Sequence, residues 1–323
     1  MAASLRKWFA RFLGGVDARA RKPNKQQSAW RKPVVRLPLR PASEPTRYLA
    51  VMTVAKNEGR YLGDWLEFQR LMGAEQVYLY DNGSTDDSPE IVAPFVREGF
   101  VTLIPWATFD DEVSPQRQGY AHALCNFGHD FRWMAFIDLD EFLFPVEAPN
   151  LVSVLRGYED CPSVCVPWFM FGFSGHETPV PGLVIENYTQ RAPFPPPPRH
   201  AKLLKWKSIV QPAEVVAVTG AHLFELASGL TGGFDERKTE VTADKATPPP
   251  GDVLRINHYY SRSRQEFAAK LNIVRFTTGP RTHRSHTDPG NRQRIMNMIE
   301  EKTVDDNTIR RFTPELRKRM RLL

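Results

Sequence analysis

Three carboxylates fall within four consecutive residues near the middle of the chain. Asp138, Asp140 and Glu141 directly follow residues 133–137, an apolar run with the composition of a buried strand. Because alternate side chains of a strand point to the same side, Asp138 and Asp140 are expected to point together. Carboxylate oxygens suit Mg²⁺ or Mn²⁺, and such an ion can hold a diphosphate and neutralise a leaving phosphate. The alternative is a surface turn, in which Asp-x-Asp triplets are common.

Two further polar loops are expected at the same edge of a sheet. Residues 48–54 have the composition of a buried strand, run into the polar residues 56–58, and precede a helical pattern that stops at Gly73. A second strand, residues 76–80, ends in Asp81. Strands that alternate with helices indicate a parallel sheet, whose ligands bind beyond the carboxyl ends of the strands. The sequence therefore predicts that three polar loops converge at one edge.

Several segments, in the expected order, resemble the GT-A glycosyltransferases, and more narrowly glycosyltransferase family 92 and bacterial family-2-like relatives. The segments are residues 54–58, 80–86, 136–142, 168–176, 207–210 and 257–260. The resemblance covers about residues 48–275. It implies an α/β, GT-A-like fold of the nucleotide-diphospho-sugar transferase kind, with a Rossmann-like mixed sheet flanked by helices.

The resemblance also implies roles for individual residues. Those implied to bind the nucleotide-sugar are Lys56, Asn57, Glu58, Asp81 and Asp138. Those implied to bind the metal, Mn²⁺ or Mg²⁺, are Asp138 and Asp140 of the DXD motif, and His258. Alternatives stay open for four residues: Asp81 in an Asx turn, Asn57 and Glu58 as a helix cap, and His258 as a structural histidine.

A catalytic base must lie within about 3 Å of the acceptor hydroxyl whose proton it takes. His176 is the first candidate, because it follows a flexible Ser-Gly segment in a motif that matches the family. Glu141 is the second candidate, and Glu177 and Glu186 remain rivals. For His176, the alternative is that it orders its own loop.

The composition indicates one large globular domain with attachments. The chain has 323 residues, of which 41% are hydrophobic, and no apolar run approaches the roughly 20 residues that span a bilayer. A cytoplasmic enzyme is therefore expected. Three cysteines do not imply a disulfide framework. We expect a basic leader at residues 1–47, a GT-A domain at 48–260 and a helical extension at 261–323.

The leader carries the positive charge of the chain. Residues 1–47 contain 12 Lys or Arg and 2 acids, a net of +10, which leaves about −4 for residues 48–323 out of a total of +6. Its apolar residues fall on one helical face: Leu5, Trp8, Phe9, Phe12 and Leu13. This pattern is typical of a helix that binds an anionic membrane surface, here the inner face of the membrane. A disordered arm and a transit peptide are alternatives, and nucleic-acid binding is not expected.

The resulting hypothesis is a metal-dependent, hexosyltransferase-like glycosyltransferase. It would move a sugar from a UDP- or GDP-sugar to the hydroxyl of a glycan, lipid or polysaccharide acceptor, with inversion as the resemblance implies and polysaccharide biosynthesis as the setting. A non-catalytic carbohydrate-binding or scaffold protein is the alternative, against which the intact acidic triplet and His258 count. A phosphohydrolase would need Thr or Val where Phe142 stands.

Overall fold

A computed structural model describes residues 34–38, 44–107, 114–242, 249–272 and 289–321. These residues belong to one compact unit. Within these ranges, no helix combines the length and the apolar character needed to cross a bilayer. The predicted leader helix, residues 5–13, lies outside the described residues, so the helix and its binding to a membrane surface stay predictions.

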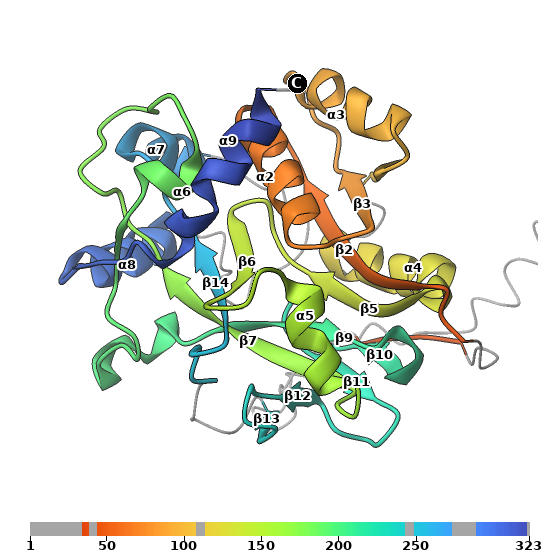
Figure 1. Ribbon diagram of the computed structural model, residues 1–323. Helices are drawn as coiled ribbons and strands as arrows, with labels where there is room; N and C mark the ends of the chain where they lie inside the picture. Colours follow the sequence, from red (N-terminus) through yellow and green to blue (C-terminus); the bar gives the residue numbers. More distant parts are fainter. Residues whose placement is uncertain (1–33, 39–43, 108–113, 243–248, 273–288, 322–323) are drawn as a thin grey trace, which may run out of the picture. The chain divides into compact units, whose positions relative to one another are not determined.

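The fold is built on a mixed sheet whose first half is parallel (Figure 1). This half consists, in spatial order, of β4 (Val101–Pro105), β3 (Gln76–Asp81), β2 (Arg47–Ala55) and β5 (Phe131–Phe136). The helices between these strands are α2 (Gly59–Leu71), α3 (Ser88–Arg97) and α4 (Pro115–Phe127). The alternation of strands and helices predicted for this part of the chain is confirmed. The carboxyl ends of the four strands therefore share one edge.

The second half of the sheet runs in both directions. It consists of β6 (Glu141–Pro145), β7 (Ser163–Met170), β9 (Trp206–Val210), β12 (Gly232–Phe234), β13 (Glu240–Thr242) and β14 (Leu254–His258). Strand β9 is antiparallel to both β5 and β7, whereas β14 is parallel to β7 and antiparallel to β6. The predicted α/β class is confirmed: a Rossmann-like mixed sheet flanked by helices.

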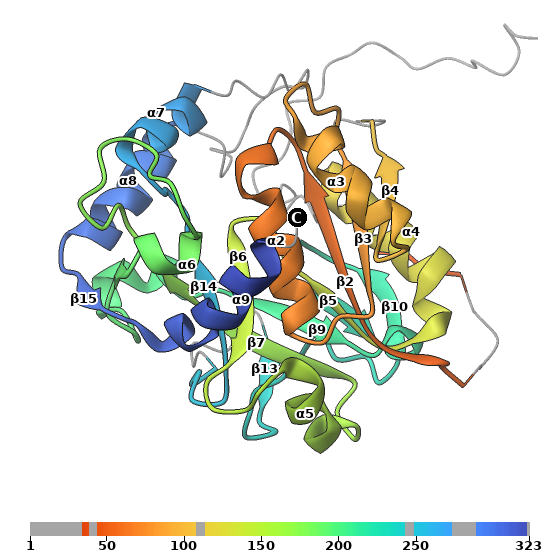
Figure 2. The ribbon, with the colours of Figure 1, turned by 45° about the horizontal axis from the view of Figure 1, so that its top comes forward.

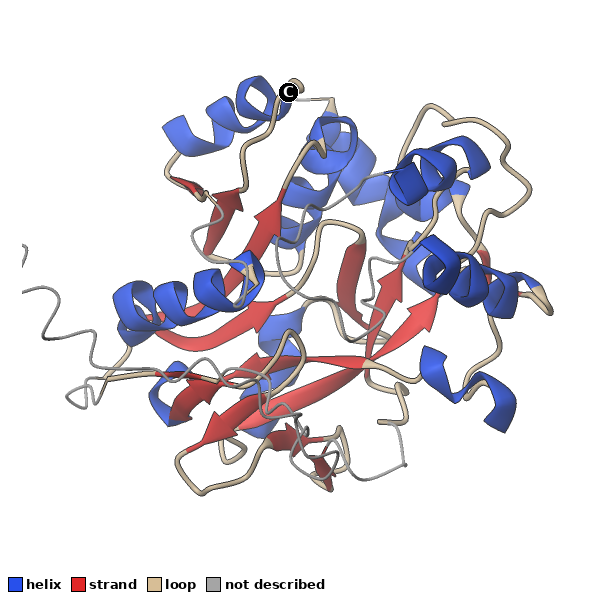
Figure 3. Ribbon diagram, turned by 180° about the vertical axis from the view of Figure 1, so that it is seen from behind, coloured by secondary structure: helices blue, strands red, loops and turns tan. Residues whose placement is uncertain are grey.

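Strand β2 shows how the sheet is covered on both faces. Leu49 and Val51 belong to the core cluster that includes residues of α2 and α3, whereas Ala50 and Met52 belong to the cluster that includes residues of α4. Side chains of a strand alternate between its faces, so β2 is buried on both. Seen from behind, helices also flank the sheet on that side (Figure 3).

Shorter elements complete the fold. A small sheet contains β1 (Val35–Arg36), β10 (Val215–Val218) and β11 (Phe224–Leu226), and a two-stranded sheet contains β8 (Gln190–Arg191) and β15 (Val304–Asp305). The remaining α-helices are α5 (Leu151–Leu155), α6 (Val184–Asn187), α7 (Arg264–Asn272), α8 (Pro289–Glu300) and α9 (Thr313–Met320). The 3₁₀ helices are η1 (Gly128–Asp130), η2 (Arg156–Tyr158), η3 (Pro198–Leu203), η4 (Pro212–Glu214) and η5 (Thr308–Phe312).

Two glycines shape the helices: one ends α2, and the other lets α4 approach the sheet closely. Gly73 has φ of +91° directly after the end of α2, as the sequence predicts for a left-handed stop. A Cβ atom on Gly119 of α4 would lie 2.9 Å from the Met52 side chain, so glycine lets this helix approach β2 closely. Gly73 ends α2, which follows the polar loop after β2. Gly119 lies in α4, which precedes β5 and the acidic turn.

The last helix packs beside α2 (Figure 2). Leu316 of α9 is fully buried, and the Arg319 guanidinium lies 3.7 Å from the Glu67 carboxylate on α2. The C-terminal part of the chain is therefore joined to the first helix of the parallel half.

Candidate active site

Asp138 and Asp140 lie in a turn between β5 and β6, and Glu141 is the first residue of β6. Strand β5 ends at Phe136, and the backbone N–H of Glu141 donates to the carbonyl of Asp138 at 3.0 Å. The expectation that Asp138 and Asp140 are alternate residues of a strand is therefore wrong, because β5 ends at Phe136 and the turn closed by this hydrogen bond runs from Asp138 to Glu141. Their carboxylates instead meet different partners.

Asp138 is held by two donors from other elements. Lys207 Nζ on β9 donates to Asp138 Oδ2 at 3.0 Å, and Gln116 Nε2 on α4 donates to Oδ1 at 2.6 Å. The Lys207 side chain is 1% exposed, and its Nζ also lies 3.6 Å from Glu141 Oε1. Burial lowers the pKa of Lys207, but the carboxylates of Asp138 and Glu141 raise it well above its usual value. Lys207 is therefore a buried ammonium that neutralises this side of the turn.

Glu141 is a fully buried carboxylate. Its Oε2 accepts the backbone N–H of Asp138 at 3.0 Å, and its Oε1 has no hydrogen-bond partner among the described residues. Burial raises the pKa of Glu141 well above its usual value, and the Lys207 ammonium opposes that shift. An acceptor hydroxyl arriving from solvent would not meet this side chain, so the base role of Glu141 stays a prediction that its burial does not favour.

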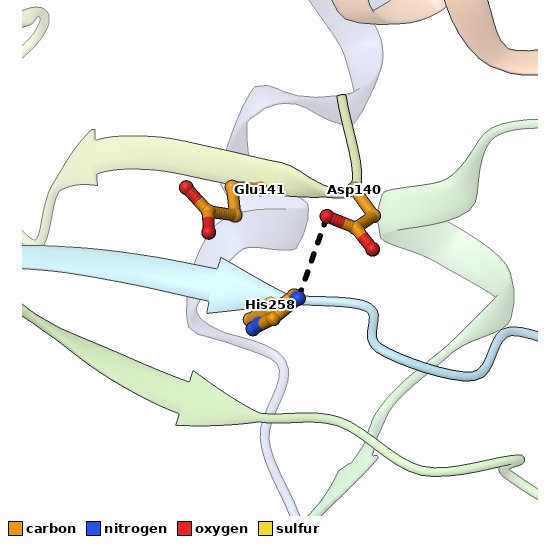
Figure 4. A group of neighbouring side chains, drawn as sticks. All are labelled: Asp140, Glu141 and His258. Carbon is orange, nitrogen blue, oxygen red and sulfur yellow. Dashed lines mark ion pairs between the residues drawn. The ribbon is translucent and has the colours of Figure 1, made fainter. Parts of the chain in front are cut away.

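Asp140 faces a histidine (Figure 4) and also contacts a lysine. Its Oδ1 lies 3.4 Å from His258 Nε2 at the end of β14, and its Oδ2 accepts from Lys270 Nζ on α7 at 2.9 Å. Burial raises the pKa of Asp140, but the charges of Lys270, His258 and Arg262 outweigh burial and hold it well below its usual value. Asp140 is therefore an ionised carboxylate directed at an imidazole nitrogen.

The residues around this turn fit a divalent metal ion. Asp140, Glu141 and His258 each offer one ligand atom, and these atoms lie within 4.8 Å of one another. Ligands about 2.1 Å from one ion and at right angles lie roughly 3 Å apart, close to the separation of Asp140 Oδ1 and His258 Nε2. Two buried atoms nearby, Glu141 Oε1 and His258 Nδ1, have no hydrogen-bond partner among the described residues. Asp138 is outside this group, and its metal role stays a prediction.

The loop after β2 is tied to the loop after β3. Asn57, at φ of +57°, donates its backbone N–H to Ser84 Oγ at 2.9 Å, and its Oδ1 accepts the backbone N–H of Thr85 at 2.7 Å. The capping alternative is not observed, because Glu58 occupies the N-cap position of α2 and its side chain makes no capping hydrogen bond. The two loops therefore form one hydrogen-bonded rim.

The other predicted nucleotide residues lie on this rim. Asp81 is half-buried, and its Oδ1 accepts the backbone N–H of Ser84, three residues further on, at 3.0 Å, so its side chain holds the loop after β3. Lys56 is exposed, and Glu58 is half-buried with its carboxylate against Arg262. Nucleotide binding by Asp81, Lys56, Asn57 and Glu58 stays a prediction.

His176 is held within its own loop. Its Nε2 lies 2.9 Å from the carbonyl oxygen of Asn187, and its own carbonyl accepts the backbone N–H of Arg264 at 3.1 Å. Its ring contacts the Tyr188 ring edge-on, with centroids 5.3 Å apart. These contacts fit the alternative that it orders the loop, and its role as the base stays a prediction.

An aromatic group lies beside His258. Trp168 packs edge-on against both His222 and His258, with ring centroids 4.9 and 4.4 Å away. Burial and the nearby Lys207 charge lower the pKa of His222 to about 3. His222 is therefore a neutral packing partner at neutral pH, and its Nδ1 lies 2.8 Å from the Trp206 carbonyl.

Four residues of the site were not assigned a role from the sequence: Gln116, Lys207, Arg262 and Lys270. Three acids in four residues signal that cations must lie nearby, because buried carboxylates need partners. That signal does not say which of the 43 Lys and Arg residues supply them.

A family comparison agrees with this geometry. The model of "Glycosyltransferase family 92" matches residues 51–299, which include the acidic turn, the rim and His258. The chain belongs to glycosyltransferase family 92. The predicted family resemblance is thereby confirmed.

Curated family 92 relatives come from plants. A family 92 protein of Ricinus communis is 27% identical over 238 residues, which cover 71% of this chain and 38% of that protein. A family 92 protein of Oryza sativa subsp. japonica is 30% identical over 191 residues, covering 56% of this chain and 30% of that protein. The chain thus spans less than half the length of these relatives.

Two solved structures are less similar to this chain in sequence than these plant proteins are. S. aureus TarS 1–349 in complex with UDP has a TM-score of 0.33 and 14% identity, covering 51% of this chain and 47% of that chain. Glucosyl-3-phosphoglycerate synthase from Mycobacterium tuberculosis, in complex with Mn²⁺, UDP-glucose and phosphoglyceric acid, has a TM-score of 0.25 and 20% identity, covering 38% of this chain and 44% of that chain.

Proposed function

We propose that this family 92 chain transfers a sugar from a nucleotide-sugar to an acceptor hydroxyl. The observation that carries the proposal is the meeting of Asp140, Glu141 and His258 in one cluster, which joins the turn after β5 to the end of β14, in a chain of this family. Ligands of α/β sheets bind beyond the carboxyl ends of the strands. The hydrogen-bonded rim of the β2 and β3 loops lies at these ends and offers Lys56, Asn57, Glu58 and Asp81 to the donor.

The donor is a UDP- or GDP-sugar, and the metal is Mn²⁺ or Mg²⁺. Asp140 and His258 would hold the ion, with Glu141 as the nearest further carboxylate. A bound ion would act as a Lewis acid and neutralise charge on the leaving diphosphate. Lys270 supports this arrangement, because its bond to Asp140 Oδ2 leaves Oδ1 directed at His258. Asp138, fixed by Lys207 and Gln116, would orient the donor ribose.

The acceptor attacks through a hydroxyl with inversion at the anomeric carbon. Its proton passes to a base, for which His176 is the first candidate and Glu141 the second. The fixed orientation of the His176 ring by the Asn187 carbonyl supports a defined direction for its other nitrogen. The acceptor class is a glycan, lipid or polysaccharide, and the setting is polysaccharide biosynthesis. The enzyme would act in the cytoplasm, with the basic leader binding anionic lipid at the inner face of the membrane.

A donor screen tests the proposal directly. The purified chain is incubated with UDP- and GDP-sugars, and release of the nucleotide diphosphate is measured with Mn²⁺, with Mg²⁺ and with EDTA. We expect release from one donor class that is lost in EDTA. Release that persists in EDTA would remove the metal from the proposal. No release and no thermal shift with any donor would overturn the transferase assignment.

A further inference from the structure

Arg262 lies between the two parts of the candidate active site. Its Nη1 donates to Glu58 Oε2 on the rim at 2.8 Å, and its guanidinium carbon lies 3.8 Å from the centroid of the Tyr61 ring on α2. Along the chain it follows His258 by four residues and precedes α7, which carries Lys270. One side chain therefore contacts the nucleotide rim from the segment that also carries residues of the metal cluster.

The guanidinium is buried and only partly satisfied. The Arg262 side chain is 11% exposed, and its Nε and Nη2 atoms have no hydrogen-bond partner among the described residues. Burying a charge with unpaired donors costs free energy unless neighbouring charges offset the cost. Glu58 and, at longer range, Asp140 raise the pKa of Arg262 against the opposing effect of burial. Arg262 is therefore a fixed positive charge between these two acids.

The backbone at Arg262 supports a specific need for this side chain. Its φ is +53°, in the left-handed region that residues other than glycine and asparagine rarely adopt. Such a conformation costs free energy and persists only where the surrounding contacts determine it. A glycine would adopt this φ without such a cost. The presence of arginine therefore supports a need for its side chain at this position.

A second set of contacts joins the start of α2 to the start of α7. Tyr61 on α2 donates its hydroxyl to Glu266 Oε1 on α7, and Glu266 Oε2 accepts the backbone N–H of Ser263 at 3.0 Å as well as the Ser263 hydroxyl. Tyr61 thus both stacks against Arg262 and holds the first turn of α7. The first turns of α2 and α7 are connected through one continuous set of contacts.

We propose that Arg262 is a positioning residue that fixes the β2–α2 rim, through Glu58 and Tyr61, against the segment carrying His258 and Lys270. Arg262 would thereby pre-organise the rim for a nucleoside diphosphate without contacting it. This inference rests on the proposed function, because it requires that the rim binds the nucleotide. Pre-organisation lowers the ordering cost of binding, so its loss weakens nucleotide affinity.

Arg262→Gly separates positioning from a general structural role. We expect the variant to bind UDP or GDP at least about fivefold more weakly by calorimetry with saturating Mn²⁺, the lower end of typical coupling between sites. Mn²⁺ binding measured without nucleotide should not weaken, because removing a cation near Asp140 reduces repulsion of the ion. A folding defect would weaken both. Nucleotide affinity equal to that of the wild type, or parallel loss of Mn²⁺ affinity, would overturn the inference.

A matched control comes from Lys238. It also has positive φ, +58°, and its Nζ lies 2.7 Å from Asp160 in a surface ion pair. Lys238→Gly therefore relaxes a similar backbone and removes an ion pair, here an exposed one away from the rim, and we expect no change in UDP or GDP affinity. An equal loss of affinity in Lys238→Gly and Arg262→Gly would count against Arg262 as a positioning residue.

Two further comparisons complete the test. Arg262→Lys keeps the charge but not the planar guanidinium over Tyr61, and we expect a smaller loss of nucleotide affinity than in Arg262→Gly; this variant serves if the glycine variant does not fold.

If Arg262 acts through Glu58, Glu58→Gln combined with Arg262→Gly should lose no more affinity than the weaker-binding single variant. A wild-type chain that binds neither UDP nor GDP would overturn the proposed function. A wild-type chain that binds one of them, with affinity unchanged in both Arg262 variants, would overturn only the positioning role.

Discussion

Asp138 and Asp140 are two residues apart and carry the same functional group, but they lie in different surroundings. Asp138 meets Lys207, a fully buried ammonium on a central strand, and Gln116 on α4. Asp140 meets His258 at the end of β14 and Lys270 on α7. The Lys270 side chain is 32% exposed. The first carboxylate is neutralised from within the protein, whereas the second is directed at an imidazole nitrogen.

The difference separates a supporting half of the site, which contains Asp138 and Lys207, from a proposed ligand half, which contains Asp140 and His258. Lys207 also neutralises Glu141, so the supporting half is a buried ion group whose removal would affect folding. The ligand half places an ionised carboxylate 3.4 Å from a nitrogen that is a common metal ligand. Identical residues in one Asp-x-Asp triplet therefore need not share one role, since the partners that reach them come from distant parts of the chain.

The largest expected effect concerns the two lysines. Lys207→Met should lower the free energy of unfolding by about 3–5 kcal/mol, because it leaves the fully buried Glu141 carboxylate uncompensated. Lys270→Met should cost about 1 kcal/mol or less, because Lys270 is partly exposed to solvent. Urea unfolding of both variants measures the difference. Similar losses would show that the two halves do not differ in the way their charges are compensated. If Glu141→Gln restores stability to Lys207→Met, the lost stability comes from the uncompensated Glu141 carboxylate.

The second prediction compares the two aspartates directly. Asp140→Asn should weaken Mn²⁺-dependent binding of the nucleotide diphosphate by about 100-fold, because it removes a charged ligand at almost constant shape. Asp138→Asn should weaken it by about tenfold or less, because that oxygen pair contacts Lys207 and Gln116. Calorimetry with and without Mn²⁺ decides the order. A greater loss of nucleotide affinity in Asp138→Asn than in Asp140→Asn would contradict the different roles given to the two aspartates. Unchanged affinity in Asp140→Asn would refute Asp140 as a metal ligand.

The third prediction concerns His258. His258→Gln should weaken Mn²⁺ binding by about tenfold while changing the melting temperature in EDTA by only a few degrees. The opposite pattern, a large loss of melting temperature with Mn²⁺ affinity retained, would identify a packing histidine held by Trp168. Paramagnetic resonance of free Mn²⁺ measures the affinity without any need for turnover.

Much of the parallel half could be predicted from sequence, because local patterns determine it. The apolar run of β2, the helical spacing of α2 and its stop at Gly73 are all local signals, and the structure agrees with them. The pairing of β14 with both β6 and β7 is not local. It depends on side-chain packing between distant segments, which periodicity does not encode.

The candidate site follows the same division. The acids were visible because three of them fall within four residues, but their directions were not, since the turn after Phe136 replaces the alternation of a strand. The link between Asp140 and His258 was expected through family resemblance rather than through spacing. Lys207, Lys270 and Gln116 became partners only through the long-range pairing of strands and helices.

The smallest expected effect tests the hydrogen bond that orients Asp138. Gln116→Leu removes the 2.6 Å bond from Gln116 Nε2 to Asp138 Oδ1 while keeping the bond from Lys207. A hydrogen bond to a charged group contributes about 1.5–3 kcal/mol, and the remaining ammonium should retain part of the orientation. We therefore expect nucleotide affinity to fall by about fivefold, below the effect of Asp138→Asn, with Mn²⁺ affinity measured alone unchanged. Because Gln116 touches the supporting half and not Asp140, a loss of Mn²⁺ affinity in this variant would mean that the two halves act as a single unit.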